Sequence, residues 1–317
     1  MSVALLFSPQ GSQIVGMGRQ LAERSDAARA TFDEADAVLG WSVSDTCWEG
    51  PQERLDDTRQ TQPCLLTTSV AAYRALRERV GVEPRVVAGH SVGEYAALVA
   101  AGVLDFAASL RLVSIRARLM SAVDAEGGMA AVIGLDRSAV EEVVAAAGRP
   151  TELVVANDNA PGQVVISGRR DALEAAEDAM RAAGARRVVR LPVSGAFHSP
   201  LMTDVADGLA TAFESEDWHD ASVPMISNVT AEPLTDAERI RALLAEQVRS
   251  PVEWVRCVER MVADGVDLAL ECGPGAALIG MVRRIAPGMR SATVGDAAGL
   301  DAAVELLRTG AAAPASA

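Results

Sequence analysis

The pentapeptide Gly89-His90-Ser91-Val92-Gly93 constrains the fold of this chain most, because it stands between a short apolar run and a helical stretch. Val86 to Ala88 predicts a buried strand, and Glu94 to Ala100 predicts a helix. A serine on such a tight turn is held out of the sheet, and both glycines are needed because side chains there would strike the neighbouring backbone. The free N–H groups at the start of the helix point at this serine. Gly-x-Ser-x-Gly also occurs in ordinary turns, so its setting is what favours a nucleophile at Ser91.

Short apolar runs alternate with longer helical patterns in the two outer parts of the chain. Strands are predicted at Val3 to Phe7, Val86 to Ala88, Met225 to Asn228 and Asp267 to Glu271, and helices at Arg19 to Leu39, Leu65 to Arg79, after Ser91, and at Thr235 to Val248. This alternation is typical of a mostly parallel sheet covered by helices on both faces. We therefore expect an α/β fold whose large domain is like that of the α/β-hydrolases.

The pattern changes at Gly127-Gly128. From there, strands are predicted at Met129 to Leu135, Leu153 to Ala156, Val164 to Ser167 and Arg187 to Leu191, and helices at Asp136 to Ala147 and Asp171 to Ala183. The order βαββαβ is the ferredoxin-like pattern. It predicts a small domain over residues 127–196, inserted into a large domain made of residues 1–126 and 197–308. The segment 309–317 is rich in Ala and Pro, and is expected to be a flexible tail.

Composition excludes several classes of protein. With 317 residues, of which 50% are hydrophobic, the chain can bury a large core. It has no bilayer-spanning apolar run and no signal-peptide pattern, so a cytoplasmic location is expected. The net charge of −14 disfavours nucleic acid and membrane surfaces as partners.

All 29 basic residues are arginine, which excludes lysine nucleophiles. The scattered cysteines predict buried thiols rather than disulfides or a metal site: Cys47, Cys64, Cys257 and Cys272.

A nucleophilic serine needs a base, and the chain has three histidines. The ring of His90 is expected to project away from Ser91, and His219 lies in a polar stretch that is expected at the surface. His198 lies in the Gly- and Pro-bounded loop Ser194 to Pro200, the kind of loop that carries functional side chains. Loop histidines are often only solvated, so the residues alone leave this role open. The order of Ser91 before His198 matches the α/β-hydrolase arrangement.

A second glycine-rich loop, Ser8-Pro9-Gln10-Gly11-Ser12-Gln13, ends the first predicted strand. Such a loop beside the strand of the nucleophile is a natural source of one backbone N–H of an oxyanion hole, with the N–H of Val92 as the other. A plain strand-to-helix turn fits the same spacing equally well.

Motifs spread in order over nearly the whole chain resemble the acyl-carrier-protein S-malonyltransferases of fatty-acid and polyketide synthesis. They are Gln10 to Gln13, Gly89 to Glu94, Arg116 with Met120, Ala156 to Gln163 running into Ile166 to Gly168, Gly195 to Ser199, Gln247 with Pro251 and Val252, and Gly273 to Gly275. So many separate motifs at the spacing of one family are far more specific than any one of them.

The resemblance implies a catalytic role for five positions. Ser91 would be the nucleophile and His198 its general base. Gln10 and Val92 would supply the N–H groups of the oxyanion hole. Gln247 would orient the imidazole in the place that an acidic residue holds in other hydrolase-like enzymes.

Other positions bear on the acyl group. The resemblance implies that Arg116 holds the malonyl carboxylate, with Met120 beside it. A guanidinium suits this role because it grips a carboxylate with two parallel hydrogen bonds. From the residues alone, an arginine on the helix surface fits equally. The chain resembles the modular polyketide acyltransferases that use malonyl rather than methylmalonyl, in having the valine Val92 and the phenylalanine Phe197. This resemblance implies a preference for malonyl.

The implied reaction moves malonyl from CoA to Ser91 and then to the phosphopantetheine thiol of an acyl carrier protein, in two steps and with no bound cofactor or metal. The chain departs from the family at Ser8-Pro9, where the family usually has Pro-Gly. A proline removes a donor and fixes φ, so the first oxyanion loop is expected to be shaped differently.

An acidic enzyme that binds an acidic carrier protein needs a local basic patch. Residues 169–190 contain six arginines against four acids. The docking candidates are Arg186, Arg187 and Arg190, and Arg283-Arg284 is a second candidate. A solvated arginine face is the alternative for each of them.

Three other functions stay open at this stage. An acyl hydrolase that clears stalled carriers would use the same nucleophile, although Arg116 favours a dicarboxylic acyl group. A catalytically silent carrier-binding module would require Ser91 or His198 to be missing or misplaced. A discrete polyketide-synthase acyltransferase could use another acyl-CoA or a carrier-bound donor, and the altered Ser8-Pro9 loop is the one feature that favours it.

Overall fold

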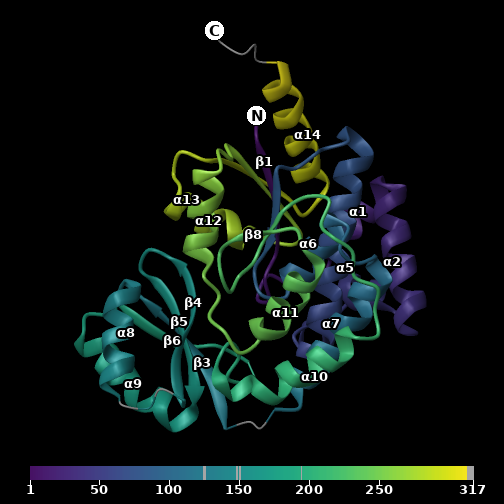
Figure 1. The fold of residues 1–317 in the computed structure, drawn as a ribbon. Helices are drawn as coiled ribbons and strands as arrows, with labels where there is room; N and C mark the ends of the chain where they lie inside the picture. The colour runs from purple at the N-terminus through teal and green to yellow at the C-terminus, as the bar shows by residue number, and fades with distance from the viewer. Residues whose placement is uncertain (124–125, 148, 150, 194, 313–317) are drawn as a thin grey trace.

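The computed structural model describes residues 1–312 apart from 124, 125, 148, 150 and 194. These residues form a six-stranded sheet and a separate four-stranded sheet (Figure 1). The large sheet has the order β10 (Arg290–Val294), β9 (Leu268–Cys272), β1 (Val3–Phe7), β2 (Val86–Gly89), β7 (Met225–Ile226) and β8 (Pro233–Leu234). All neighbouring pairs are parallel except β7 with β8. The predicted α/β fold with a mostly parallel sheet is confirmed.

The strand β1 shows why this sheet is covered on both faces. All five of its residues are buried. Leu5 and Phe7 belong to one hydrophobic cluster, while Ala4 and Leu6 belong to another on the opposite face. Side chains alternate along a strand, so a continuous apolar run is what a strand buried on both faces requires.

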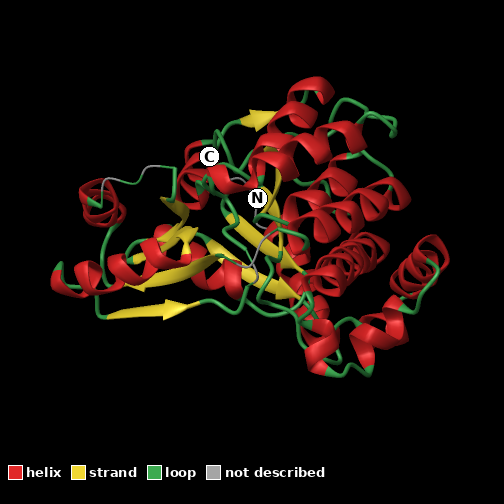
Figure 2. Ribbon diagram, turned by 90° about the horizontal axis from the view of Figure 1, so that it is seen from below, coloured by secondary structure: helices red, strands yellow, loops and turns green. Residues whose placement is uncertain are grey.

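Helices supply both covering layers, as Figure 2 shows in the view from below. They are α1 (Arg19–Arg24), α2 (Asp26–Leu39), α3 (Val43–Trp48), α4 (Gln52–Leu55), α5 (Thr58–Val80), α6 (Gly93–Ala101), α7 (Phe106–Ser121), α10 (Thr203–Phe213), α11 (Ala237–Gln247), α12 (Trp254–Ala263), α13 (Ala277–Ile285) and α14 (Ala297–Ala312), with a 3-10 turn, η1, at Pro200–Met202. The helices α5, α6 and α14 pack in the larger cluster, and α12 and α13 pack on the other face.

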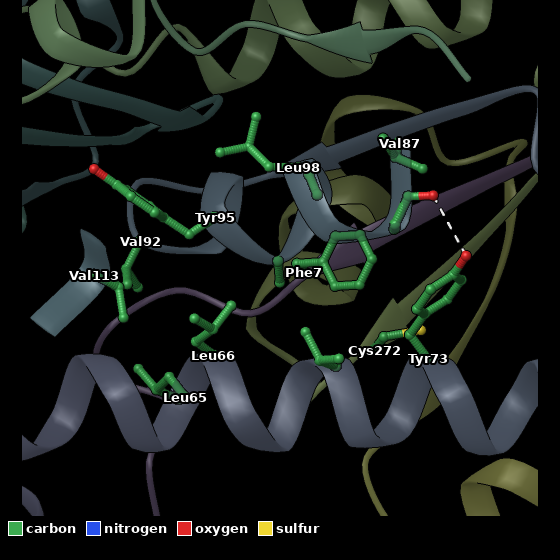
Figure 3. Packing of buried hydrophobic residues seen from close by; sticks show 14 of the residues in the cluster. Phe7, Leu65, Leu66, Tyr73, Val87, Val92, Tyr95, Leu98, Val113 and Cys272 are labelled. Atoms are coloured by element: carbon green, nitrogen blue, oxygen red, sulfur yellow. Dashed lines mark hydrogen bonds between the residues drawn. The ribbon is translucent and has the colours of Figure 1, made fainter. Parts of the chain in front are cut away.

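The larger cluster is built around α5, a helix of 23 residues. Figure 3 shows Leu65, Leu66 and Tyr73 of this helix pointing toward the sheet and α6. The rings of Phe7 and Tyr73 meet edge to face, with centroids 6.2 Å apart. The turn that carries Ser91 is therefore supported by a close-packed hydrophobic core.

The four-stranded sheet lies to one side of the large sheet. It has the order β4 (Leu153–Ala160), β5 (Gln163–Arg169), β3 (Gly127–Ile133) and β6 (Arg187–Arg190), and all its pairs are antiparallel. The helices α8 (Arg137–Ala146) and α9 (Arg170–Ala182) pack against one face through a separate core. The predicted order βαββαβ is confirmed, while the domain boundaries at 127 and 196 stay a prediction.

One helix prediction and the predicted start of the C-terminal tail were wrong. The single helix expected over Arg19 to Leu39 is broken at Ser25, whose side chain accepts a hydrogen bond from the Ala28 N–H and so begins a new helix. The tail expected over residues 309–317 is helical as far as Ala312, because α14 continues through this alanine-rich stretch. Residues 313–317 lie outside the described residues.

Some single-residue predictions can be checked directly. The four cysteines are free and buried, as predicted. His219 is exposed, also as predicted. Across the described residues, we find no helix with the length and apolar character needed to span a bilayer.

The sheet registers bring three loops together. Phe7 pairs with Gly89 on one side and with Cys272 on the other, so the loops that follow β1, β2 and β9 leave the same edge of the sheet. The small sheet joins this edge through β4, where Val252 N donates to Ala156 O at 2.8 Å and Asp158 N donates to Val252 O at 3.0 Å. The candidate site lies where these segments meet.

Candidate active site

Ser91 lies on the turn between β2 and α6, with a left-handed backbone at φ 52°. A Cβ at Gly89 would lie 1.9 Å from the main-chain carbon of Gly93, and a Cβ at Gly93 would lie 2.2 Å from the main-chain oxygen of Phe7. Both distances are far too short for real atoms, so the prediction that this turn requires two glycines is confirmed. Positive φ at a non-glycine residue is strained, and such strain is concentrated at functional sites.

His198 meets Ser91 across 107 positions of sequence, with 2.8 Å between Nε2 and Oγ. Its other ring nitrogen, Nδ1, lies 2.9 Å from the main-chain oxygen of Gln247 and 3.2 Å from that of Ser250. Because two carbonyls can only accept, the hydrogen-bond network assigns the proton to Nδ1. Nε2 is then free to accept the proton of the Ser91 hydroxyl.

Electrostatics keep this imidazole neutral. Burial lowers the pKa of His198 to about 3, and the positive charge of Arg116 acts in the same direction. The carbonyls of Gln247 and Ser250 oppose this shift only in part. A histidine that is unprotonated at neutral pH is in the state that a general base needs.

Arg116 is buried on α7 and reaches the same serine oxygen. Its Nη2 donates to Ser91 Oγ at 3.0 Å and to Gln247 Oε1 at 3.1 Å, and its Nη1 donates to Gln62 Oε1 at 2.8 Å. The guanidinium carbon lies 5.8 Å from the centre of the Tyr95 ring. Arg116 Nε is buried without an acceptor among the described residues.

Gln247 meets the imidazole through its main chain, not its side chain. The side chain instead donates from Nε2 to the main-chain oxygen of Ser91 at 2.9 Å and to the carboxylate of Glu94. Its Oε1 accepts from Arg116. The orienting atom for His198 is therefore a carbonyl, which any residue at position 247 would carry.

Three buried polar residues of the site were given no role in it by the sequence analysis: Gln62, Glu94 and Asn228. Asn228 follows β7, and its Oδ1 accepts from the Ser91 N–H at 2.7 Å while its Nδ2 donates to Gly89 O at 2.7 Å. Glu94 accepts from the Asn228 N–H at 2.6 Å. A charged residue inside the apolar stretch after Gly93 was a signal for Glu94. A lone amide at a strand end gives no such signal.

Gln10 and Val92, the predicted oxyanion residues, lie on the loops after β1 and β2. The side chain of Gln10 is held by Thr58 and Gln62 at 3.4 Å each. The main-chain N–H groups of Gln10 and Val92 have no acceptor within the described ranges. Both are available to a ligand, although their role stays a prediction.

Ser8, where the chain departs from the family, has a partner of its own. Its hydroxyl donates to the buried carboxylate of Glu271 at 3.2 Å, and the same carboxylate accepts from the N–H groups of Leu278 and Ile279 at the start of α13. Burial raises the pKa of Glu271, while these hydrogen bonds lower it. The first loop is thus tied to α13 by a side chain.

A cleft of about 590 Å³ opens over Ser91 and His198, between the two sheets. Its walls include one predicted oxyanion residue, two of the predicted acyl-contact residues and two asparagines of β4: Gln10, Met120, Phe197, Asn157 and Asn159. His90 also lines the cleft, but its Nε2 lies 2.8 Å from Asn159 Oδ1 and its ring packs 5.4 Å from that of Trp254. His90 therefore joins the turn to the small sheet.

The predicted docking arginines differ in their surroundings. Arg190 is paired with Glu177. Arg186 and Arg187 are exposed, and no acid pairs with either of them in the described part of the chain. In the second candidate, Arg284 donates to Gln163 Oε1 at 2.8 Å and to Pro161 O.

The described residues contain no cluster of three His, Cys, Asp or Glu side chains able to hold a metal ion. Residues 4–299 match the family model described as the acyl transferase domain, which gives the class of protein.

The malonyl CoA-acyl carrier protein transacylase of Escherichia coli (strain K12) is 41% identical over 305 residues, covering 96% of this chain and 99% of that protein. The protein of the same name from Bacillus subtilis (strain 168) is 41% identical over 309 residues, covering 96% and 97%. This chain belongs to the family of malonyl CoA-acyl carrier protein transacylases.

Solved structures that are similar to this chain over nearly its whole length include proteins of the same family. The acyl-carrier-protein S-malonyltransferase of Burkholderia pseudomallei 1710b has a TM-score of 0.94 and 39% identity, covering 96% of this chain and 100% of that one. A malonyl-transacylase in complex with its type II PKS acyl-carrier protein has a TM-score of 0.93 and 40% identity, covering 96% and 99%.

Proposed function

We propose that this protein transfers a malonyl group from CoA to the phosphopantetheine thiol of an acyl carrier protein, through an ester on Ser91. One observation carries the proposal. The Ser91 oxygen lies 2.8 Å from a neutral imidazole and 3.0 Å from a buried guanidinium. A base activates the nucleophile, and the cation beside it suits an acyl group that carries a carboxylate.

In the first step, Ser91 Oγ attacks the thioester carbonyl of malonyl-CoA while His198 Nε2 takes the hydroxyl proton. The resulting oxyanion accepts hydrogen bonds from the N–H groups of Gln10 and Val92. The carbon–sulfur bond then breaks, the proton moves from His198 to the departing sulfur, and CoA leaves as the thiol. The carbonyls behind His198 stabilise its transient positive charge.

In the second step, the carrier thiol gives its proton to His198 and attacks the ester carbon. The carbon–oxygen bond to Ser91 breaks, and the proton returns to Oγ. The two steps are chemically symmetric, because both exchange an oxygen and a sulfur on one carbonyl carbon. One base and one oxyanion site therefore serve both.

The choice of malonyl follows from geometry around the ester. The malonyl carboxylate lies only two bonds beyond the ester carbon, so it falls within reach of a guanidinium that contacts Oγ. Nε of Arg116 has no acceptor in the described chain and is free to donate to this carboxylate. Nη2, the other nitrogen of the edge that binds a carboxylate with two parallel hydrogen bonds, directs its two hydrogens at Ser91 Oγ and Gln247 Oε1, so the carboxylate takes the place of one of these acceptors. Phe197 and Met120 line the same cleft and limit branching at the α-carbon.

The test is to incubate the protein with malonyl-CoA and measure the intact mass. We expect one malonyl ester per chain, mapped to Ser91 by proteolysis, and none in Ser91→Ala. Ser114→Ala, which changes a serine bonded only to its own helix, should label as the wild type does. Labelling of Ser91→Ala would refute the proposed nucleophile.

Hydrolysis is the competing fate of the ester. Comparing its decay in water with its decay in the presence of a carrier protein decides between transferase and hydrolase, and we expect the carrier to accelerate decay by orders of magnitude. The absence of a bound cofactor and a cytoplasmic location stay predictions.

A further inference from the structure

Glu94, Asn228 and Gln247 form a buried group of hydrogen-bonded side chains behind the Ser91 turn, which we call the clamp. Each is at most 1% exposed. They come from α6, from the segment after β7 and from the end of α11. Their contacts are with one another, with the main chain of the turn and with Arg116.

The clamp holds both main-chain polar groups of Ser91. Asn228 Oδ1 accepts from the Ser91 N–H at 2.7 Å, and Gln247 Nε2 donates to the Ser91 carbonyl at 2.9 Å. Asn228 also binds the carbonyl of Gly89, two residues before the nucleophile, at 2.7 Å. A serine in a left-handed conformation relaxes unless its surroundings hold it, and these bonds act directly on the strained residue.

Glu94 sets the direction of the hydrogen bonds. Its two oxygens accept from Asn228 N–H and from Gln247 Nε2, and both of these groups can only donate. With its nitrogen held by a carboxylate, the Gln247 amide must present Oε1 to Arg116, 3.1 Å away. Arg116 therefore donates a hydrogen bond to Gln247, and Gln247 donates one to Glu94. The carboxylate of Glu94 fixes these directions, because it can only accept.

We propose that Glu94 and Asn228 are positioning residues for the acyl transfer proposed above, on which this inference rests: with Gln247 they hold the backbone of Ser91 and orient Gln247 Oε1 toward Arg116. Neither residue touches the acyl group. Asn228 acts on the nucleophile through its main chain, and Glu94 acts on Arg116 through Gln247.

Protonation of Glu94 has the same effect as an amide in its place. A carboxylic acid or an amide can accept on only one side, so one of the two donors would face another donor. Burial raises the pKa of Glu94 to about 7, while its hydrogen bonds and the charge of Arg116 oppose the shift. The other titratable groups that interact with it, Tyr95 and Cys257, have pKa values raised by burial and stay neutral. The His198 base is already deprotonated at pH values well below 7.

The experiment measures single-turnover ester formation from malonyl-CoA in Glu94→Gln and Asn228→Ala. We expect Asn228→Ala to lower the acylation rate constant about a hundredfold with KM for malonyl-CoA within about twofold, because only the nucleophile shifts. Glu94→Gln should lower the rate about tenfold and also raise KM, because the contact of Gln247 with Arg116 is lost. Glu216→Gln is the matched control, since Glu216 pairs with Arg111 on the same helix as Arg116 and should give wild-type values.

The pH profile separates positioning from stability. Wild-type acylation should fall on the acid side of a pKa of about 7, and this limb should be absent in Glu94→Gln. A limb that persists in Glu94→Gln, or variants that acylate at the wild-type rate while losing thermal stability, would refute the proposal. If the variants do not fold, a flat wild-type profile between about pH 5 and pH 9 refutes it alone. Failure of the wild type to form an ester would refute the proposed function instead.

Discussion

Arg116 is a buried cation whose direct partners are all neutral. Its guanidinium donates to Gln62, Gln247 and Ser91, and no ion pair to it occurs in the described ranges. A buried charge without a counter-charge is costly, and burial lowers the pKa of this guanidinium. The carboxylate of Glu94 is hydrogen-bonded to it only through Gln247, and its charge opposes the lowering of the Arg116 pKa only in part. A bound anionic acyl group would supply the missing negative charge, so the site is prepared for a dicarboxylic acyl group before any substrate arrives.

Replacing Arg116 by alanine should therefore change the selectivity for malonyl over acetyl more than it changes the reactivity of Ser91. We expect Arg116→Ala to reduce kcat/KM with malonyl-CoA by about 10²- to 10⁴-fold, and with acetyl-CoA by much less, because acetyl has no carboxylate to lose. Intact mass measured with each donor gives the ratio. Arg111→Ala on the same helix should leave the ratio as it is, and an unchanged ratio in Arg116→Ala would remove the carboxylate-binding role.

Sequence reasoning at this scale could name Arg116 but could not choose between site and surface. Three arginines lie on one helix, and only packing shows that Arg116 is buried while Arg111 and Arg118 are exposed. The same limit hid Asn228, whose partners Gly89 and Ser91 lie more than 130 positions away. Polar contacts between distant segments leave no periodic pattern in the chain.

At the scale of elements, α6 approaches β1 so closely that only glycine fits between them. A Cβ at Gly93 would lie 2.2 Å from Phe7 O, the last residue of β1. The close approach places the start of α6, and with it the N–H of Val92, beside the loop that carries Gln10. A short contact between two main chains thus sets the geometry of both predicted oxyanion donors.

Gly93→Ala should lower both stability and activity. The clash is with backbone that cannot move freely, so we expect a loss of about 3 kcal/mol or more in the free energy of unfolding, measured by urea denaturation. Gly280→Ala is the matched control, because a Cβ at this helical glycine meets nothing within 4 Å. That change should raise stability by up to about 1 kcal/mol, since alanine favours the helix. A Gly93→Ala protein as stable as the wild type would contradict the close approach.

Elements with one strong local signal were predictable, and those defined by their neighbours were not. The apolar runs of β1 and β2 and the βαββαβ order of the small sheet could be seen in the sequence. The strand β7 was predicted over Met225 to Asn228 and spans only Met225–Ile226. The strand β8 has two residues, too few to carry a pattern, and is defined by its pairing with β7. The break at Ser25 was missed because the apolar period continues across it.

At the scale of the whole molecule, the candidate site depends on how the two sheets are joined. The loop of Val252 pairs with β4 of the small sheet and begins just after the carbonyls that hold His198. Arg137 of α8 binds Glu253 in the same segment, with its Nη2 3.0 Å from Oε1. The small sheet and the imidazole therefore share one support. This link between distant segments follows from the tertiary arrangement and has no counterpart in any single motif.

Charge also acts at this scale. A chain of net charge −14 repels an acidic carrier protein unless basic groups near the cleft oppose the field. Of the predicted docking residues, Arg190 is neutralised by Glu177, whereas Arg186 and Arg187 have no acid partner in the described chain. Among the docking candidates of the small sheet, the positive charge that no acid pairs with therefore lies at the start of β6. We propose Arg186 and Arg187 as the carrier-docking surface.

Charge reversal tests this surface. Arg186→Glu and Arg187→Glu should each raise KM for an acyl carrier protein about five- to tenfold at low salt, and the effect should shrink as salt screens the interaction. Arg190→Glu should have a smaller effect, because its charge is already paired. Arg29→Glu changes an exposed arginine of α2 and serves as the control, with KM close to the wild-type value. If reversal at Arg186 and Arg187 leaves KM at the control value, the carrier docks elsewhere.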